Sequence, residues 1–398
     1  MYAHDILACV NKKDLGKKAL GRSLAGEALA LHKKLGGKIF TGLAMPIKTR
    51  EELSLLYTPG VGAVSSYVAK HPKAARDYTI KGKTVAVISD GSAVLGLGNI
   101  GPLGALPVME GKCALFKTFA NVDAFPLVLD TQNVDEIVET IVRIAPAFGG
   151  INLEDFSAPR CFEIEARLKE QLDIPVMHDD QHGTAIVVVA ALLNAAKVIK
   201  KKFEQLNVVI VGAGAAGTAV AKLLLRAGVK DIVVLDSRGS IVRGREDLRG
   251  YKEELADLTN PRGVSGDLQD AMRGADAVIG VSGPGTIKAE HIARMVERPI
   301  VFALANPMPE IMPSEARAAG AIVVATGRSD YPNQINNSLV FPGVFRGALD
   351  HNVKKITDEM KLAAAKNLAA LVRKPTTQKI IPGPFEKGVM QAVARSIK

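Results

Sequence analysis

The 398-residue chain has no tryptophan, only six tyrosines and twelve phenylalanines, and three cysteines. The scarcity of aromatic residues argues against nucleic-acid binding by base stacking. Cys9, Cys113 and Cys161 are far apart and form no C-x-x-C pair, which argues against a disulfide framework or a thiolate metal cluster. The longest apolar run, 185–193, is well short of the roughly 20 residues that a membrane span needs. Polar residues near the start argue against a secretory signal. We therefore expect a soluble, cytoplasmic protein with neither a membrane nor a nucleic acid as partner.

Apolar residues (47%) and charged residues (23%) occur in the proportions of an ordinary globular protein, and the length predicts two or three domains. Lysine and arginine outnumber aspartate and glutamate by 51 to 41, which gives a net charge of +10. Eight of the cations lie in residues 11–38 beside only two acids. We interpret this segment as a solvated basic face that favours small anionic substrates.

Strand-like and helix-like runs alternate along most of the chain, which is typical of βαβ units and a mainly parallel sheet. Residues 11–56 are expected to be helical with an interruption at Gly36–Gly37, and Ser157 is expected to cap a helix that ends near Leu172. The expected strands are 83–89, 125–129, 151–153, 174–177, 207–211, 231–235, 276–281, 299–305 and 321–325. The expected later helices are 183–201, 218–227, 342–350, 357–372 and 384–397.

We therefore predict an α/β protein with two domains and a helical C-terminus. Residues 1–180 are expected to form a parallel α/β catalytic and substrate domain. Residues 181–345 are expected to form a Rossmann-like dinucleotide-binding domain, and residues 346–398 to form helices that pack back on the body.

One glycine-rich motif, GAGAAG, directly follows a predicted strand and leads into a predicted helix. In such a motif Gly212 allows the tight turn, Gly214 lets the backbone approach a pyrophosphate, and Gly217 lets helix and strand pack closely. Ala215 and Ala216 belong to the helix N-terminus, which favours phosphate charge. The combination predicts a dinucleotide site.

The next predicted strand ends at Asp236, 24 residues after Gly212, where a carboxylate can bind the hydroxyls of the adenosine ribose. Asp236 would repel a 2′-phosphate, which favours NAD over NADP. Arg238 follows closely and either pairs with such a phosphate or is a solvated loop residue. We favour NAD. The stretch 281–285, with Ser282, either lies against the ribose or nicotinamide or is a plain turn.

A second glycine-rich stretch, residues 96–101, has no strand leading directly into it and no acid-terminated strand after it. It therefore does not predict a second dinucleotide site. Pro102 suits a helix start. The loop either presents backbone N–H groups to a substrate phosphate or carboxylate, or is a tight turn.

Two pairs of acidic residues follow two predicted strands: Glu154 and Asp155 come after the first, and Asp179 and Asp180 after the second. The carboxyl ends of parallel strands share one edge of a sheet, where ligands bind. Carboxylates gathered at one edge repel each other unless a cation or proton lies between them, and oxygen ligands suit Mg²⁺ or Mn²⁺. The pattern predicts a metal site, with helix capping by Asp155 and Asp180 as the alternative.

Four further side chains have two interpretations each. His178 and His182 flank the second acidic pair and are either metal ligands or, as we favour, hydrogen-bonded structural histidines. Lys112 lies in a mostly apolar stretch, where desolvation would lower its pKa and make a neutral base available. Snorkelling of Lys112 to solvent is the ordinary alternative. Tyr57 precedes a turn and is either a proton donor or a residue that caps a core edge.

Motifs spread over residues 50–345 resemble those of malic enzymes, in the family's order. The matching segments are LYTPGV at 56–61, SDGSAVLGLGNIG at 89–101, PVMEGK at 107–112, LEDF at 153–156, HDDQHGT at 178–184, ALANP at 303–307 and NNSLVFPG at 336–343. The chain is similar to the short prokaryotic branch, which has no appended acyltransferase-like domain.

The resemblance implies a metal-dependent oxidative decarboxylation of L-malate to pyruvate and CO₂, with reduction of NAD or NADP and decarboxylation of oxaloacetate as a partial reaction. Lys112 corresponds to the family's base, Asp179 to the residue that supports it, and Tyr57 to the acid that protonates the enol. Asn306 and Asn337 correspond to residues that hold the substrate, Asn306 also contacting the cofactor.

The same resemblance makes Glu154, Asp155 and Asp180 the ligands of Mg²⁺ or Mn²⁺, and it implies a homodimer or homotetramer. One position departs from the animal and plant branch, which has an arginine for a malate carboxylate where this chain has Ser92 and Ala93. Backbone amides of the 96–101 loop are the alternative ligand for that carboxylate.

Two other functions stay open at this point. A non-decarboxylating NAD-dependent 2-hydroxy-acid dehydrogenase would leave the carboxylate cluster unexplained. A catalytically inactive nucleotide-sensing module is disfavoured because Lys112, Tyr57 and the three acids are all intact.

Overall fold

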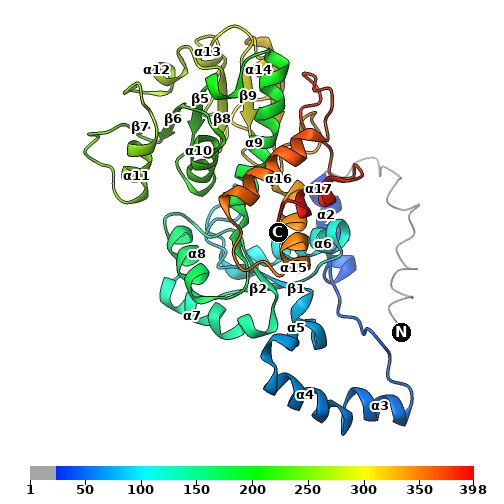
Figure 1. The fold of residues 1–398 in the computed structure, drawn as a ribbon. Helices are drawn as coiled ribbons and strands as arrows, with labels where there is room; N and C mark the ends of the chain where they lie inside the picture. The colour runs from blue at the N-terminus through cyan, green and yellow to red at the C-terminus, as the bar shows by residue number, and fades with distance from the viewer. Residues whose placement is uncertain (1–23) are drawn as a thin grey trace. The chain divides into compact units, whose positions relative to one another are not determined.

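The computed structural model describes residues 24–398, and the chain divides into two compact units, Met1–Thr79 and Ile80–Lys398. Cys9 and the part of the predicted helical stretch before residue 24 lie outside the described residues. Figure 1 labels the elements used below.

In the described part of the first unit, residues 24–35 and 50–56 are helical as the sequence predicts, whereas the expectation of helix over residues 38–49, which include Gly42 and Pro46, is wrong. Its helices are α2 (Leu24–Leu35), α3 (Arg50–Leu56), α4 (Gly60–Lys70) and α5 (Ala75–Tyr78). The predicted interruption follows α2, where Gly36 and Gly37 take positive φ angles of 64° and 127°. Thr49 begins α3 with a capping box: its hydroxyl accepts from the Glu52 amide at 3.1 Å, and the Glu52 carboxylate accepts from the Thr49 amide at 2.9 Å.

The second unit contains a four-stranded parallel sheet in the order β2-β1-β3-β4. Its elements are β1 (Thr84–Ser89), α6 (Gly101–Ala120), β2 (Asp123–Val128), α7 (Val134–Ile144), β3 (Gly150–Leu153), α8 (Arg160–Gln171) and β4 (Val176–His178). Buried side chains of Ile88, Ile141, Leu153 and Ile164 share one core between the sheet and helices α7 and α8. The alternation of strands and helices read from the sequence is confirmed here.

A six-stranded sheet in the order β10-β9-β8-β5-β6-β7 follows, with only β7 antiparallel. Its strands are β5 (Asn207–Val211), β6 (Asp231–Asp236), β7 (Gly239–Ser240), β8 (Ala277–Gly280), β9 (Ile300–Ala303) and β10 (Val323–Thr326). Its helices are α10 (Ala215–Ala227), α11 (Tyr251–Leu258), α12 (Leu268–Met272), α13 (Ala289–Ile292) and α14 (Pro313–Ala318). This strand order is that of a Rossmann fold, in which the order reverses between β5 and β8 and opens a crevice at their carboxyl ends.

Helix α9 (Asp179–Ile199) connects the two sheets and packs against α10 and against α16 (Asp358–Ala370) (Figure 1). It is long and apolar enough to match the composition of a membrane span, but most of its residues are buried inside the protein, as in a core helix. The buried Asn194 amide ties it to the C-terminal segment, donating to the carbonyls of Ala369 and Ile380 at 2.9 Å each.

The remaining C-terminal helices are α15 (Phe341–Asp350), which packs against α6, and α17 (Val389–Ala394), which packs against α15. Helix α17 is shorter than the predicted 384–397, because Gly388 takes a φ of 90° and begins it late. The predicted Ser157 cap is wrong as well. Pro159 is the N-cap of α8, and the Ser157 hydroxyl accepts from the Arg160 guanidinium at 3.0 Å instead of from a backbone amide.

Candidate active site

Four acidic residues meet at the carboxyl edge of the smaller sheet because β3 and β4 are neighbouring strands. Leu153 and His178 lie opposite each other in the register of the pair, so the residues that follow them converge. One carboxylate oxygen from each of Glu154, Asp155 and Asp180 lies within 4.8 Å of the others. The sequence-based expectation that these acids share one edge is confirmed, while their role as ligands stays a prediction.

The environment of these three acids fits a divalent cation. Glu154 and Asp155 are only 3% and 4% exposed. Burial, followed by the charge of Asp180, raises the pKa of Glu154 well above its ordinary value and that of Asp155 to about 8. Asp155 Oδ2 is buried without a hydrogen-bond partner in the described structure, and its backbone takes a left-handed φ of 56°. A buried, unpartnered carboxylate oxygen on a left-handed backbone raises the free energy of the folded chain, and a bound dication would offset this increase.

The positions of the two helix starts exclude helix capping as the role of Asp155 and Asp180. Asp180 lies inside the first turn of α9 rather than at its N-cap, which is His178. Asp155 precedes α8 by several residues and is not its cap. Asp180 Oδ2 instead accepts from the Asp155 amide at 2.8 Å, a contact that joins the two strand ends.

The two histidines beside these acids have different surroundings. His182 is bonded to the buried Glu165 at 2.9 Å, which confirms the structural interpretation for this residue. His178 is fully buried, its ring nitrogens have no hydrogen-bond partner in the described structure, and burial lowers its pKa. Its Nε2 is 3.8 Å from Asp180 Oδ2. The expectation of a hydrogen-bonded His178 is therefore wrong.

Lys112 reaches the same acids from α6 and does not snorkel to solvent. It is 7% exposed, its Nζ is 2.6 Å from Glu154 Oε1, and it forms an ion pair and hydrogen bond with Asp179. The ring of Phe341 lies 4.4 Å from Nζ. Burial by itself would lower the pKa of Lys112, as the sequence analysis expects, but the charges of Asp179 and Glu154 outweigh burial and raise it.

The two asparagines of the predicted site lie at separate places around it. Asn337 begins the turn before α15 and lies close to α9. A Cβ placed on Gly183 of α9 would lie 3.1 Å from the Asn337 Cβ and would collide with Asp179. Asn306 follows β9 and lies against the glycine-rich loop, because a Cβ on Gly96 would collide with the Asn306 carbonyl. The loop and Asn306 are thus in direct backbone contact.

The glycine-rich loop leads into α6 with Pro102 in the first turn, as the sequence predicts. Ser92 is buried and already bonded: it donates to Asp90 Oδ1 at 2.6 Å and accepts from the Ser157 amide at 2.9 Å. It is therefore not free to bind a carboxylate. Tyr57 belongs to the first unit, where it ends α3 with 64% of its surface exposed, and its role stays a prediction.

The predicted dinucleotide motif lies at the point where the strand order of the larger sheet reverses. Gly212 takes a φ of 119°, and a Cβ there would come within 2.5 Å of the Val281 carbonyl oxygen. Gly217 packs directly on the Gly212 carbonyl, as the motif requires. Gly214 is the N-cap of α10, so Ala215 and Ala216 begin that helix. Ala215 also packs against the core of the smaller sheet, which brings the start of α10 to the edge of both sheets.

A cavity of about 990 Å³ extends from this motif along the carboxyl end of β6. Gly212, Gly214, Asp236 and Ser282 all line it. Ser282 is held by Glu310, a fully buried residue whose carboxylate accepts from the amides of Ser282 at 2.8 Å and Ala305 at 3.0 Å. Glu310 is not predictable from the sequence, because nothing in the segment around it signals that it joins two strand ends.

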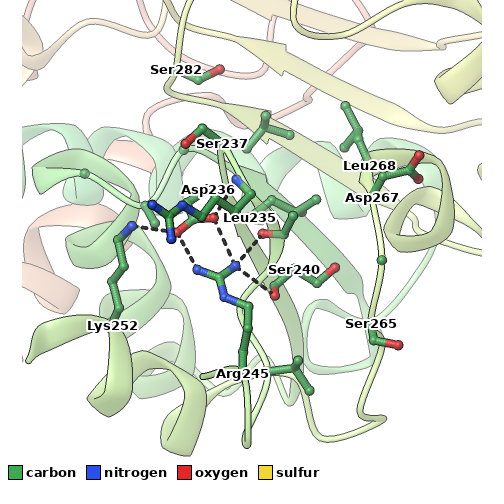
Figure 2. Close-up of a pocket in the computed structure, with 18 of the residues that line it drawn as sticks. Leu235, Asp236, Ser237, Ser240, Arg245, Lys252, Ser265, Asp267, Leu268 and Ser282 are labelled. Carbon is green, nitrogen blue, oxygen red and sulfur yellow. Dashed lines mark hydrogen bonds and ion pairs between the residues drawn. The ribbon is translucent and has the colours of Figure 1, made fainter. Parts of the chain in front are cut away.

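Two further residues that the sequence analysis missed surround Asp236. Arg245 binds both oxygens of its carboxylate, at 3.0 and 2.6 Å, and Lys252 binds Oδ2 at 2.5 Å (Figure 2). Partial burial raises the pKa of Asp236, but hydrogen bonds from these two cations outweigh burial and hold it below its ordinary value. Arg238, which the sequence analysis weighed, pairs instead with Asp247 at 3.0 Å.

Substitutions of Gly214 and Gly217 distinguish the effect of the loop on cofactor binding from its effect on the stability of the fold. No atom lies within 4 Å of a Cβ placed on Gly214, so Gly214→Ala is expected to leave the melting temperature nearly unchanged and to weaken dinucleotide binding about tenfold or more by crowding the pyrophosphate. Gly217→Ala is expected to lower the melting temperature as well, because its methyl group collides with the Gly212 carbonyl. Calorimetric titration with NADH and thermal unfolding measure the two effects. Unchanged NADH binding by Gly214→Ala would contradict the assignment of this loop.

A Rossmann crevice and a buried lysine–carboxylate cluster within one compact unit define the class of dinucleotide-dependent enzymes. Comparison with known proteins narrows the class. The family profiles "Malic enzyme, N-terminal domain" and "Malic enzyme, NAD binding domain" match residues 37–169 and 181–394. The chain belongs to the malic enzyme family.

Individual relatives cover nearly the whole chain. It is 53% identical to an NAD-dependent malic enzyme of Geobacillus stearothermophilus over 395 residues, which is 99% of this chain and 82% of that protein. It is 48% identical to an NADP-dependent malic enzyme of Halomonas elongata, over 91% of this chain and 86% of that one. The solved structure of the NAD-dependent malic enzyme of Thermotoga maritima has a TM-score of 0.90 at 50% identity and covers 93% of this chain and 98% of its own.

Proposed function

We propose that this protein catalyses the oxidative decarboxylation of L-malate to pyruvate and CO₂, with NAD or NADP as hydride acceptor and Mg²⁺ or Mn²⁺ as the metal. The observation that carries the proposal is the buried cluster of Lys112 with Glu154, Asp155, Asp179 and Asp180, in the same compact unit as the dinucleotide crevice. Family membership supports the same reaction. The cytoplasm is the proposed location.

In this proposal a dication on the acids would offset the charges that raise the pKa of Lys112, so that its neutral Nζ can accept the proton of the C2 hydroxyl. Asp179 holds Lys112 in place through their hydrogen bond. Glu154, Asp155 and Asp180 would hold the dication. When bound, the dication offsets the negative charge of the acids and draws electron density from the substrate's ketone oxygen. Asn306 and Asn337 orient the substrate, and backbone amides of the 96–101 loop bind a carboxylate in place of the arginine that this chain lacks.

The reaction is tested by mixing the protein with L-malate, NAD or NADP, and either Mn²⁺ or a chelator. Reduced nicotinamide, followed by its near-ultraviolet absorbance, is expected to form with Mn²⁺ and to fall to background with the chelator. Metal-independent reduction would favour a non-decarboxylating dehydrogenase, in which the carboxylate cluster has no catalytic role. Tight NAD binding without turnover of any 2-hydroxy acid would favour a nucleotide-sensing module.

Tyr57 is proposed to protonate the enol carbon that decarboxylation leaves behind, in the site of its own chain or that of a neighbour. Tyr57→Phe is expected to reduce malate turnover about a hundredfold while oxaloacetate decarboxylation stays measurable, because the phenol acts only in the last step. Steady-state rates of both reactions provide the test, with Tyr78→Phe, also in the first unit, as the control. Full malate turnover by Tyr57→Phe would remove this residue from the mechanism.

We also propose a homodimer or homotetramer. The helices described in the first unit bury no residue. The side chains of Leu24, Leu29, Leu43 and Leu55 are 72–83% exposed. Apolar surface of this extent needs cover, and a second copy of the chain provides it in this proposal. Light scattering on the purified protein is expected to give twice or four times the 42.1 kDa chain mass, and a monomer would contradict it.

A further inference from the structure

Helix α8 carries a buried carboxylate that the reaction proposed above does not use. Glu165 is 6% exposed and lies in the middle of α8, which packs against β4. Its Oε1 accepts from the His178 amide at 2.8 Å and pairs with Lys169 at 2.9 Å, and its Oε2 is bonded to His182 Nε2 at 2.9 Å. A carboxylate offers acceptors only, so donors from β4, α8 and α9 share this one group.

Two of these bonds hold the junction between β4 and α9 at both of its ends. Strand β4 is at the edge of the smaller sheet, so an amide that points away from β3 has no strand partner. Glu165 supplies the acceptor for such an amide at His178, the last residue of β4. His182 lies about one helical turn further along, in α9. Asp179 and Asp180 lie between the two bonded residues.

Outside the acid and lysine cluster itself, the start of α9 has few side-chain bonds of its own. His178 is the N-cap but makes no capping bond, and its ring nitrogens have no partner in the described structure. Asp179 Oδ1 and Gln181 Nε2 are also buried there without a partner. The carboxylate of Glu165 lies beside this helix N-terminus, where the helix dipole favours a negative charge. The position of the first turn of α9 therefore depends on Glu165.

We propose that Glu165 is a positioning residue of the active site, which holds the start of α9 through His178 and His182. Asp180 is thereby kept beside the other two proposed metal ligands, and Asp179 beside the proposed base. The inference rests on the metal role proposed above. It gives a role in metal binding to α8, which contributes none of the three acids of the proposed metal site.

The test is calorimetric titration of Mn²⁺, with NADH titrated separately into the same protein. Glu165→Ala is expected to weaken Mn²⁺ binding between about tenfold and a hundredfold, because the start of α9 loses both bonds. NADH affinity is expected to stay within about twofold, since no residue of α8 or α9 lines the dinucleotide cavity. Below the unfolding temperature, a loss of stability alone would not weaken Mn²⁺ binding selectively.

Glu165→Gln is the conservative comparison. Its amide oxygen can still accept from the His178 amide, and its amide nitrogen can donate to His182 once the imidazole changes tautomer. We expect this variant to bind Mn²⁺ within about threefold of wild type. Lys169→Gln is the matched control: it removes the third partner of Glu165, a lysine on the same helix with 28% of its side chain exposed, and leaves both bonds to the start of α9. It is expected to bind Mn²⁺ as wild type does.

Normal Mn²⁺ binding by Glu165→Ala would overturn the inference. An equal loss in Glu165→Gln and Glu165→Ala would overturn it too, because the effect would then come from the charge of Glu165 and not from its hydrogen bonds. Thermal unfolding checks the fold of each variant. If Glu165→Ala does not fold, His182→Ala takes its place: it keeps the His178 bond, so the expected loss is about threefold or more, and unchanged Mn²⁺ binding would again overturn the inference.

The same titrations distinguish this inference from the function on which it rests. Absence of Mn²⁺ binding by wild type would overturn the proposed metal site and the role of Glu165 together. Normal Mn²⁺ binding by wild type without malate turnover would contradict only the proposed reaction.

Discussion

Lys112→Ala is expected to lower malate turnover about a thousandfold or more, the scale of a lost general base. Lys112 is the one cation within the acid cluster, in contact with both Glu154 and Asp179, so no neighbouring group described in the structure can replace it. Near-ultraviolet absorbance of reduced nicotinamide measures the rate. The loss is expected in kcat, because the proton transfer belongs to the transition state.

Removing Lys112 also leaves two buried carboxylates without their partner, so a folding defect must be separated from a catalytic one. Lys112→Arg keeps the positive charge but does not release a proton near neutral pH, and we expect it to fold and remain inactive. Lys117→Ala is the matched control on the same helix: its lysine pairs with Asp123 at the surface. Near-normal turnover by Lys112→Arg would remove Lys112 from the role of base.

Asp155→Asn is expected to weaken Mn²⁺ binding about a hundredfold or more and to abolish metal-dependent turnover. The substitution keeps the shape of the side chain and removes a charge that has no hydrogen-bond partner at Oδ2 in the described structure. Because burial and Asp180 raise the pKa of Asp155, the metal-free variant is also expected to be more stable than wild type at neutral pH.

Calorimetric Mn²⁺ titration and denaturant unfolding in the presence of a chelator measure these two effects. Glu163→Gln is a suitable control, because it removes an acid of α8 that pairs with Arg167 at the surface. A variant that binds Mn²⁺ normally would show that Asp155 is not a ligand. A variant that is less stable than wild type without metal would contradict the destabilising effect assigned to the unpartnered Asp155 carboxylate.

Much of the fold could be predicted because its signals are local. The strands and the glycine motif near Gly212 depend on residues adjacent in sequence, and parallel strands place their carboxyl ends at one edge, which brought Glu154 and Asp180 together. Ser157 was misassigned as a cap because the sequence does not show that its hydroxyl faces Arg160.

The missed residues depend on long-range contacts. Arg245 and Lys252 reach Asp236 from a loop and a helix that follow it by 9 and 16 residues, with no motif to mark the spacing. The pKa of Lys112 was expected to fall on burial, because the sequence gives its apolar neighbours and not the acids that the fold brings to it. Local patterns thus predict the strands and helices that carry the site, whereas long-range contacts determine which charged side chains meet there.

The most direct test of the proposed reaction is the ratio of pyruvate to reduced nicotinamide formed from L-malate with Mn²⁺. Both products are measured in the same reaction, pyruvate after quenching with acid and the reduced cofactor by absorbance. The mechanism around Lys112 and the three acids predicts one pyruvate for each reduced nicotinamide, with release of CO₂. Accumulation of oxaloacetate in place of pyruvate, at the same yield of reduced cofactor, would contradict it.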